Sequence, residues 1–105
     1  MTQSLSYVPL SDALTIAHVN AGRLALLAAF DSNENVVIEL DPAANVDVAG
    51  VQLVESARLY AGIHGKGLTL AAPAQGRLLE VLQACGILPG SAETRTFWLC
   101  EGADL

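Results

Sequence analysis

Few side chains in this sequence have the spacing that catalysis or metal binding requires. Asp41 and Asp47 come nearest to a carboxylate pair, but no proton donor or base accompanies them, so general acid–base chemistry is unsupported. His18 and His64 have neither metal-ligand nor nucleophile spacing. The Gly-Lys-Gly segment at 65–67 is too short to cradle a phosphate and is predicted to be a turn. We therefore expect no enzyme activity, no cofactor and no metal site.

Asp47 has a structural role available to it. It stands directly before a segment with helical apolar spacing, where an Asp side chain accepts hydrogen bonds from free backbone amides and favours the helix dipole. We therefore predict that Asp47 is the N-cap of a helix, whether or not it also contacts a partner.

Net charge limits the classes of partner, and the cysteines bear on the redox state of the protein. Eleven acidic against five basic residues give a net charge of −6, which argues against nucleic acid and against an anionic membrane surface. The longest apolar run, 24–30, is far shorter than the roughly 20 residues of a membrane span, and the first ten residues do not resemble a signal peptide. We expect a cytoplasmic protein without membrane insertion, in which Cys85 and Cys100 are reduced thiols.

Hydrophobic periodicity predicts alternating strands and helices, which is typical of the α/β class. The expected order is β-β-α-β-α-β-α, with the first two strands forming a hairpin-like edge of a four- to five-stranded mixed sheet. Three or more helices are expected mainly on one face, and the apolar segment 36–40 is expected inside the sheet. The predicted strands cover 4–9, 13–16, 36–40 and 68–71, and the predicted helices cover 18–30, 48–63 and 75–85.

The chain length suits one domain, assigned to residues 1–90, followed by an extension at 91–105. In the preceding helix, the side predicted to face inward carries Leu78, Leu79, Leu82 and Cys85. The extension contains an aromatic cluster at 97–99 and an acidic end. This cluster either packs on the domain or binds a partner, and packing is favoured because exposed aromatic clusters are uncommon.

An apolar strand and a loop are followed in this chain by Asp47, Val48, Ala49, Gly50 and Val51. This order resembles the centre of the STAS domain, the anti-sigma-factor-antagonist family, where an apolar strand and a loop precede Asp-Ser-Ser/Ala-Gly-Leu. The resemblance covers about residues 5–88. Its other parts are the entry to the first helix, the central strand, a glycine turn with the next strand, and the last helix, at 14–17, 38–40, 65–70, 73–82 and 85–87.

The resemblance implies a non-catalytic module for protein–protein interaction in bacterial-type signal transduction. Asp47, Val48, Ala49, Gly50 and Val51 would bind the partner, which would be a kinase-like anti-sigma factor or another regulatory protein. In many relatives the Ser after the Asp is phosphorylated, and here Val48 holds that position, so no phosphorylation is expected in this loop. Because the family includes small subunits that dock to ABC (lipid) transporters, a transporter ATPase is the alternative partner. An enzyme of unrecognised class is the second alternative.

Overall fold

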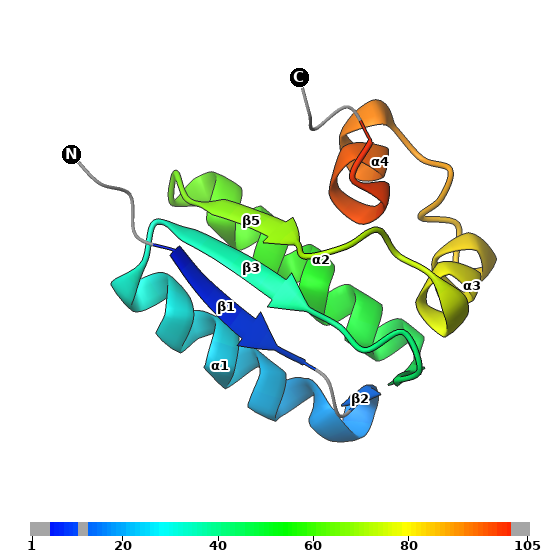
Figure 1. The fold of residues 1–105 in the computed structure, drawn as a ribbon, viewed down its shortest axis with the longest axis horizontal. Helices are drawn as coiled ribbons and strands as arrows, with labels where there is room; N and C mark the ends of the chain where they lie inside the picture. Colours follow the sequence, from blue (N-terminus) through cyan, green and yellow to red (C-terminus); the bar gives the residue numbers. More distant parts are fainter. Residues whose placement is uncertain (1–4, 11–12, 102–105) are drawn as a thin grey trace.

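The structure is a computed structural model that describes residues 5–10 and 13–101. Its main sheet has three parallel strands, β1 (Leu5–Pro9), β3 (Asn35–Glu39) and β5 (Gly67–Leu70), in the order β1-β3-β5. A separate parallel pair joins β2 (Ala13–Leu14) to β4 (Asn45–Val46). The prediction of an α/β fold with the segment near 36–40 inside the sheet is confirmed, because β3 pairs on both sides (Figure 1).

Two long helices form a second layer. α1 (Val19–Ser32), preceded by the short 3-10 helix η1 (Ile16–His18), lies beside α2 (Val48–Ile63), and both lie behind the sheet in Figure 1. α3 (Gly76–Ala84) lies near the carboxyl ends of the strands, and α4 (Ala92–Leu99) lies beside β5 (Figure 1). α1 and α2 therefore cover one face of the sheet, while α3 and α4 lie at its end and edge.

Most of the core lies between the sheet and the helices α1 and α2. Strand side chains alternate between the two faces, and those on the covered face are buried, among them Val36 and Ile38 of β3. Apolar side chains of the helices meet them, including Phe30 of α1 and Val54 of α2. On the opposite face, Tyr7 is exposed.

Pro9 is compatible with the position of β1 at the edge of the sheet. The amide of Leu10 donates to the carbonyl of Glu39 at 2.9 Å, so the neighbouring residue Pro9 has its nitrogen on the outer side of β1. A proline breaks no ladder hydrogen bond at that position, because no strand pairs there in the described residues.

The predicted hairpin and the predicted mixed sheet are wrong. In the described residues β1 does not pair with β2; each of them pairs in parallel with a strand that follows α1, and the main sheet has three strands. The predicted turn at 11–12 lies outside the described residues. Sequence proximity favours a hairpin locally, whereas the crossover through α1 brings the later strands alongside in parallel.

Two further differences concern the C-terminal third. The prediction that Cys85 faces inward is wrong: α3 ends one residue earlier, Cys85 is exposed at its C-cap, and Val81 is buried instead. Gly86 follows with φ of 84°, the left-handed conformation that commonly ends a helix. α4 had no counterpart among the predicted elements, and its Trp98 is fully buried in the common core.

Among the described residues, no helix combines the length and the apolar character that crossing a membrane requires.

Candidate functional site

Asp47 lies between β4 and α2, at the position that the sequence assigned to a partner-binding loop. The two oxygens of its carboxylate accept hydrogen bonds from two helices. Oδ1 accepts a hydrogen bond from the amide of Gly50 in α2, and Oδ2 accepts one from the amide of Ile16 in η1, both at 3.0 Å. The first bond is the predicted N-cap of α2, which is thereby confirmed. The second bond ties the start of α2 to the start of η1, 31 residues earlier in the sequence.

These bonds favour the charged form of Asp47. The amide of Ile16, followed by those of Gly50 and Ala49, lowers the pKa of the Asp47 carboxyl below its ordinary value of 3.8. Hydrogen bonds to the charged form have this effect because they stabilise the carboxylate over the acid. Asp47 is therefore ionised at neutral pH, and its proton is not available for acid–base chemistry there.

Gly50 is explained by a close approach of two backbone segments. A Cβ atom at this position would lie 1.9 Å from the carbonyl oxygen of Leu14 in β2. The same carbonyl accepts the amide of Asp47 at 3.1 Å, which holds the start of α2 against β2. The glycine is thus required by packing, independently of any partner.

The five residues predicted to bind a partner differ in exposure. Gly50 and Val51 are buried, while Asp47 and Ala49 are partly buried. Val48 is the exception, since its side chain is 46% exposed on the first turn of α2. Ile16, which sequence reasoning did not select, is 71% exposed and is joined through its amide to Asp47. Ile16, Asp47, Val48 and Ala49 are called the Asp47 surface below.

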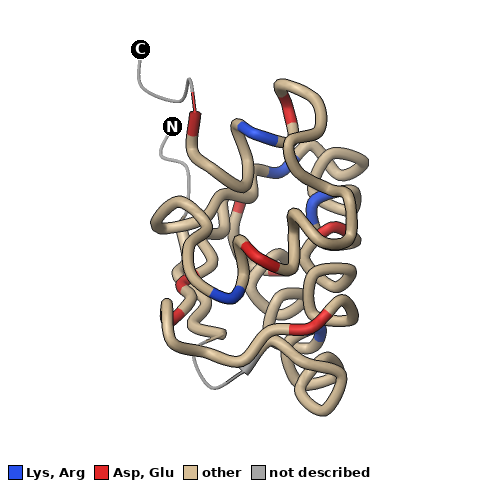
Figure 2. Tube along the Cα trace, turned by 90° about the vertical axis from the view of Figure 1, so that its right-hand side faces the viewer, with Lys and Arg blue, Asp and Glu red and all other residues tan. Residues whose placement is uncertain are grey.

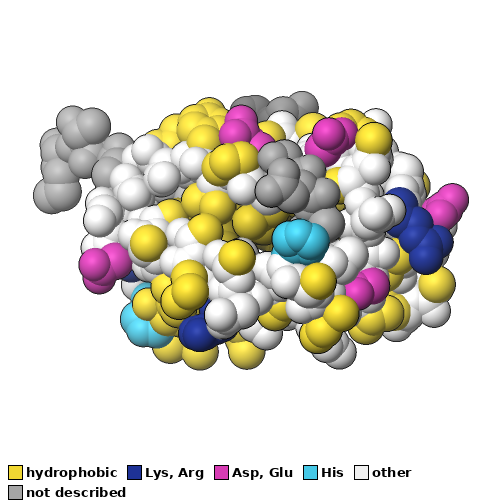
Figure 3. Space-filling view, turned by 90° about the horizontal axis from the view of Figure 1, so that it is seen from below, with side chains coloured by type: hydrophobic (Ala, Val, Ile, Leu, Met, Phe, Trp, Pro, Cys, Tyr) yellow, Lys and Arg dark blue, Asp and Glu magenta, His cyan; other side chains and the backbone are white. Residues whose placement is uncertain are grey.

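The remaining candidates for chemistry have local structural partners. Seen from below, the two histidine side chains are well apart (Figure 3). His18 contacts Thr15 Oγ1 at 3.2 Å, and His64 stacks on Tyr60 with ring centroids 4.1 Å apart. Asp41 Oδ1 accepts an amide two residues ahead at 2.9 Å, so this carboxylate stabilises its own loop.

The Gly-Lys-Gly segment at 65–67 is part of the turn into β5, as predicted. Lys66 Nζ donates to the carbonyl oxygens of Phe30 and Asn33 at 2.6 and 3.0 Å, which ties this turn to the end of α1. In Figure 2, the positions of Lys and Arg are spread along the chain trace and alternate with those of Asp and Glu. Within 5–10 and 13–101, no group of three or more His, Cys, Asp or Glu side chains could hold a metal ion.

Sequence reasoning missed two concave regions. A cavity of about 230 Å³ lies at the carboxyl ends of β3 and β5, lined by Glu39, Asp41, Gln75 and mostly apolar residues. A groove of about 910 Å³ is bounded by α2, β5 and α4. The available signal for the groove was the i, i+4 pair Leu59 and Ile63 on the outer side of α2.

Comparison of the chain with protein-family models, curated proteins and solved structures found no match. The STAS assignment consequently depends on the sequence segments described above and stays a prediction.

Proposed function

We propose that this chain is a non-catalytic protein–protein interaction module of the STAS type, which docks a regulatory protein through the Asp47 surface. The observation that carries this proposal is the exposure of two apolar side chains, Ile16 and Val48, beside a carboxylate whose two oxygens are both occupied by backbone amides.

The geometry supports docking over catalysis. The carboxylate of Asp47 holds two helix starts in place, so it acts on the shape of the surface instead of on a substrate. A surface fixed in this way loses little conformational freedom on binding, which favours affinity. Its apolar side chains would pack in the core of an interface, where water is excluded.

The chemistry of the partner follows from charge. The chain carries a net charge of −6, and one of its carboxylates, that of Asp47, lies at the surface itself. An apolar patch with basic residues around it is the complementary surface, because opposite potentials steer association and suppress wrong partners.

Val48 also defines how such docking would be regulated. The first turn of α2 contains Val48, Ala49 and Gly50, none of which has a hydroxyl group. A phosphoryl switch on Ser or Thr is thus excluded in this turn, and we propose that docking is constitutive.

The experiment is an affinity pull-down from native lysate with the wild-type chain, followed by mass spectrometry. Val48→Asp and the matched control Leu24→Asp are run in parallel; Leu24 is an exposed helical leucine on α1. A signalling protein that wild type and Leu24→Asp capture and Val48→Asp loses supports the proposal. Capture of a transporter ATPase with the same pattern would support the transporter alternative, and equal capture by all three would contradict docking at the Asp47 surface.

A further inference from the structure

The groove between α2, β5 and α4 is a second surface, separate from the Asp47 surface. It is lined by the C-terminal half of α2, from Arg58 to Ile63, whereas Asp47 caps the other end of this helix. Sixteen helical residues span about 24 Å, so the two surfaces do not overlap. A partner at the groove would therefore be independent of the proposed docking at the Asp47 surface.

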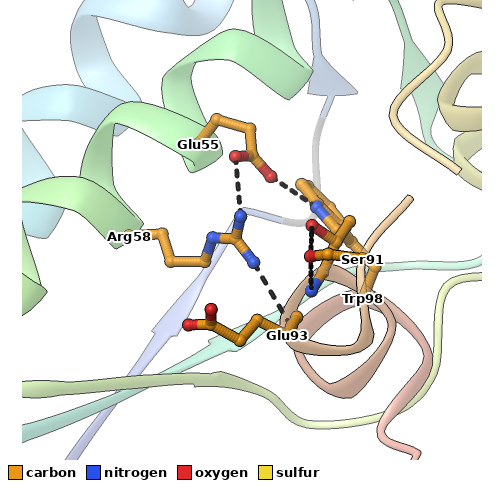
Figure 4. A network of polar contacts seen from close by, with 6 residues as sticks. Glu55, Arg58, Ser91, Glu93 and Trp98 are labelled. Atoms are coloured by element: carbon orange, nitrogen blue, oxygen red, sulfur yellow. Dashed lines mark hydrogen bonds and ion pairs between the residues drawn. The ribbon is translucent and has the colours of Figure 1, made fainter.

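The α4 wall of the groove is fixed to the rest of the domain (Figure 4). Glu55 of α2 accepts the indole Nε1 of Trp98 at 2.6 Å and pairs with Arg58 at 3.1 Å. The guanidinium of Arg58 lies 5.2 Å from the ring centroid of Phe97, and the carbonyl of Trp98 accepts the amide of Ala74. The groove is consequently preformed.

The floor of the groove is an unpaired sheet edge. The amides of Gly67 and Ala71 donate to carbonyls on the β3 side, at 2.9 Å each. Backbone groups alternate along a strand, so the amides and carbonyls of Leu68 and Leu70 point away from β3, to the side of the groove. No residue in the described part of the chain bonds to them. Unpaired strand groups of this kind are a template for another strand.

The rest of the groove indicates which side chains such a strand would carry. Leu59 and Ile63 are 69% and 76% exposed on one face of α2, which offers apolar contacts. Arg58 and Lys66 also line the groove, but their charged groups already have partners within the domain. Arg58 pairs with Glu55, while Lys66 Nζ lies 3.8 Å from a carboxylate oxygen of Glu34 and donates to two carbonyls at the end of α1. The exposed apolar pair on α2 therefore decides which side chains the groove accepts.

We propose that an extended peptide segment of a partner protein, with apolar side chains at alternate positions, binds this groove as an additional strand on β5. Its backbone pairs with Leu68 and Leu70, and its apolar side chains contact Leu59 and Ile63. Main-chain bonds supply affinity in this mode, and the alternate side chains supply specificity.

The probe is a phage-displayed library of linear peptides, selected against the full chain. We expect enriched peptides with alternating apolar residues, whose synthetic versions bind Ile63→Asp at least about tenfold more weakly than wild type. Leu24→Asp, which carries the same charge change on α1, should bind like wild type. Circular dichroism on each variant verifies the fold. Absence of enrichment, or equal binding by Ile63→Asp, would overturn the proposal.

Amide hydrogen exchange separates strand addition from other ways of filling the groove. A saturating enriched peptide should slow exchange of the Leu68 and Leu70 amides by about tenfold or more, because exchange then requires the new strand to open. The amide of Tyr7, on the opposite sheet edge, serves as the control and should not change. Binding without protection of Leu68 and Leu70, as from a peptide that docks as a helix, contradicts strand addition.

Discussion

The carboxylate of Asp47 accepts the backbone amide of Ile16 at 3.0 Å, and this bond joins the first turns of η1 and α2. The same carboxylate caps α2 through Gly50. One side chain thus holds the starts of two helices together. It thereby also sets the relative positions of the exposed residues Ile16 and Val48.

Replacement of Asp47 by Asn should lower the thermal stability at neutral pH. Asn is a good N-cap, but it has one carbonyl oxygen where Asp47 uses two oxygens, so either Gly50 or Ile16 loses its acceptor. Thermal unfolding followed by circular dichroism measures the difference in Tm between the two proteins.

The difference should depend on pH in a defined direction. The pKa of Asp47 is lowered in the folded protein, so its carboxylate contributes stability above the unfolded pKa of about 3.9, and that contribution is lost as the pH falls through the folded pKa. The Tm difference between wild type and Asp47→Asn should be constant between about pH 5 and 7 and should shrink below about pH 4. A difference that grows on acidification would show that the Asp47 charge does not stabilise the fold.

Gly50→Ala should destabilise the protein by about 2 kcal/mol or more, because its Cβ would overlap the Leu14 carbonyl and backbone must move to relieve the contact. Gly62→Ala is the matched control in the same helix. No atom lies within 4 Å of a Cβ added there, so this change should be neutral or stabilising by up to about 1 kcal/mol. Urea unfolding gives both free energies. Equal effects of the two substitutions would refute the packing role of Gly50.

Trp98 should report on the whole domain when the protein unfolds. It is the single tryptophan of the chain, it is fully buried, and it bonds Glu55 of α2. In urea, its fluorescence and the far-UV circular dichroism should therefore change in one coincident transition. An earlier fluorescence transition would show that α4 unfolds separately.

Trp98→Phe should keep the fold and lower the free energy of unfolding by about 2 kcal/mol, since it removes a hydrogen bond to a carboxylate and part of a buried ring system. Urea unfolding followed by circular dichroism provides the value. A change within experimental error would show that the contact between Glu55 and Trp98 contributes little.

The sequence was sufficient for features that depend on local pattern. Helical periodicity and an Asp at the N-cap located α2 at Val48–Ile63, and the continuous apolar run located β3. It failed where pairing is decided far along the chain, as for β2, which pairs with β4 instead of forming a hairpin. α4 is eight residues long with little amphipathic pattern, so its position depends on tertiary contacts of Trp98 with Glu55.

In the candidate site, too, features of local sequence were predicted and contacts between distant segments were missed. Asp47 and Val48 were found because capping and an aligned motif are visible in sequence. Ile16 was missed because its proximity to Asp47 arises only in the folded chain. The groove beside β5 was missed for the same reason, as its three walls come from distant segments.

The most direct test of the proposed docking is to measure stability and partner affinity of Val48→Asp on the same samples, using the purified protein captured in the pull-down. An Asp in the first turn of α2 suits the helix dipole, so the free energy of unfolding should stay within about 1 kcal/mol of wild type. An unpaired charge buried in an interface costs several kcal/mol, so affinity should fall by at least about a hundredfold, while Leu24→Asp retains it. Unchanged affinity in a stably folded Val48→Asp variant would contradict docking through the Asp47 surface.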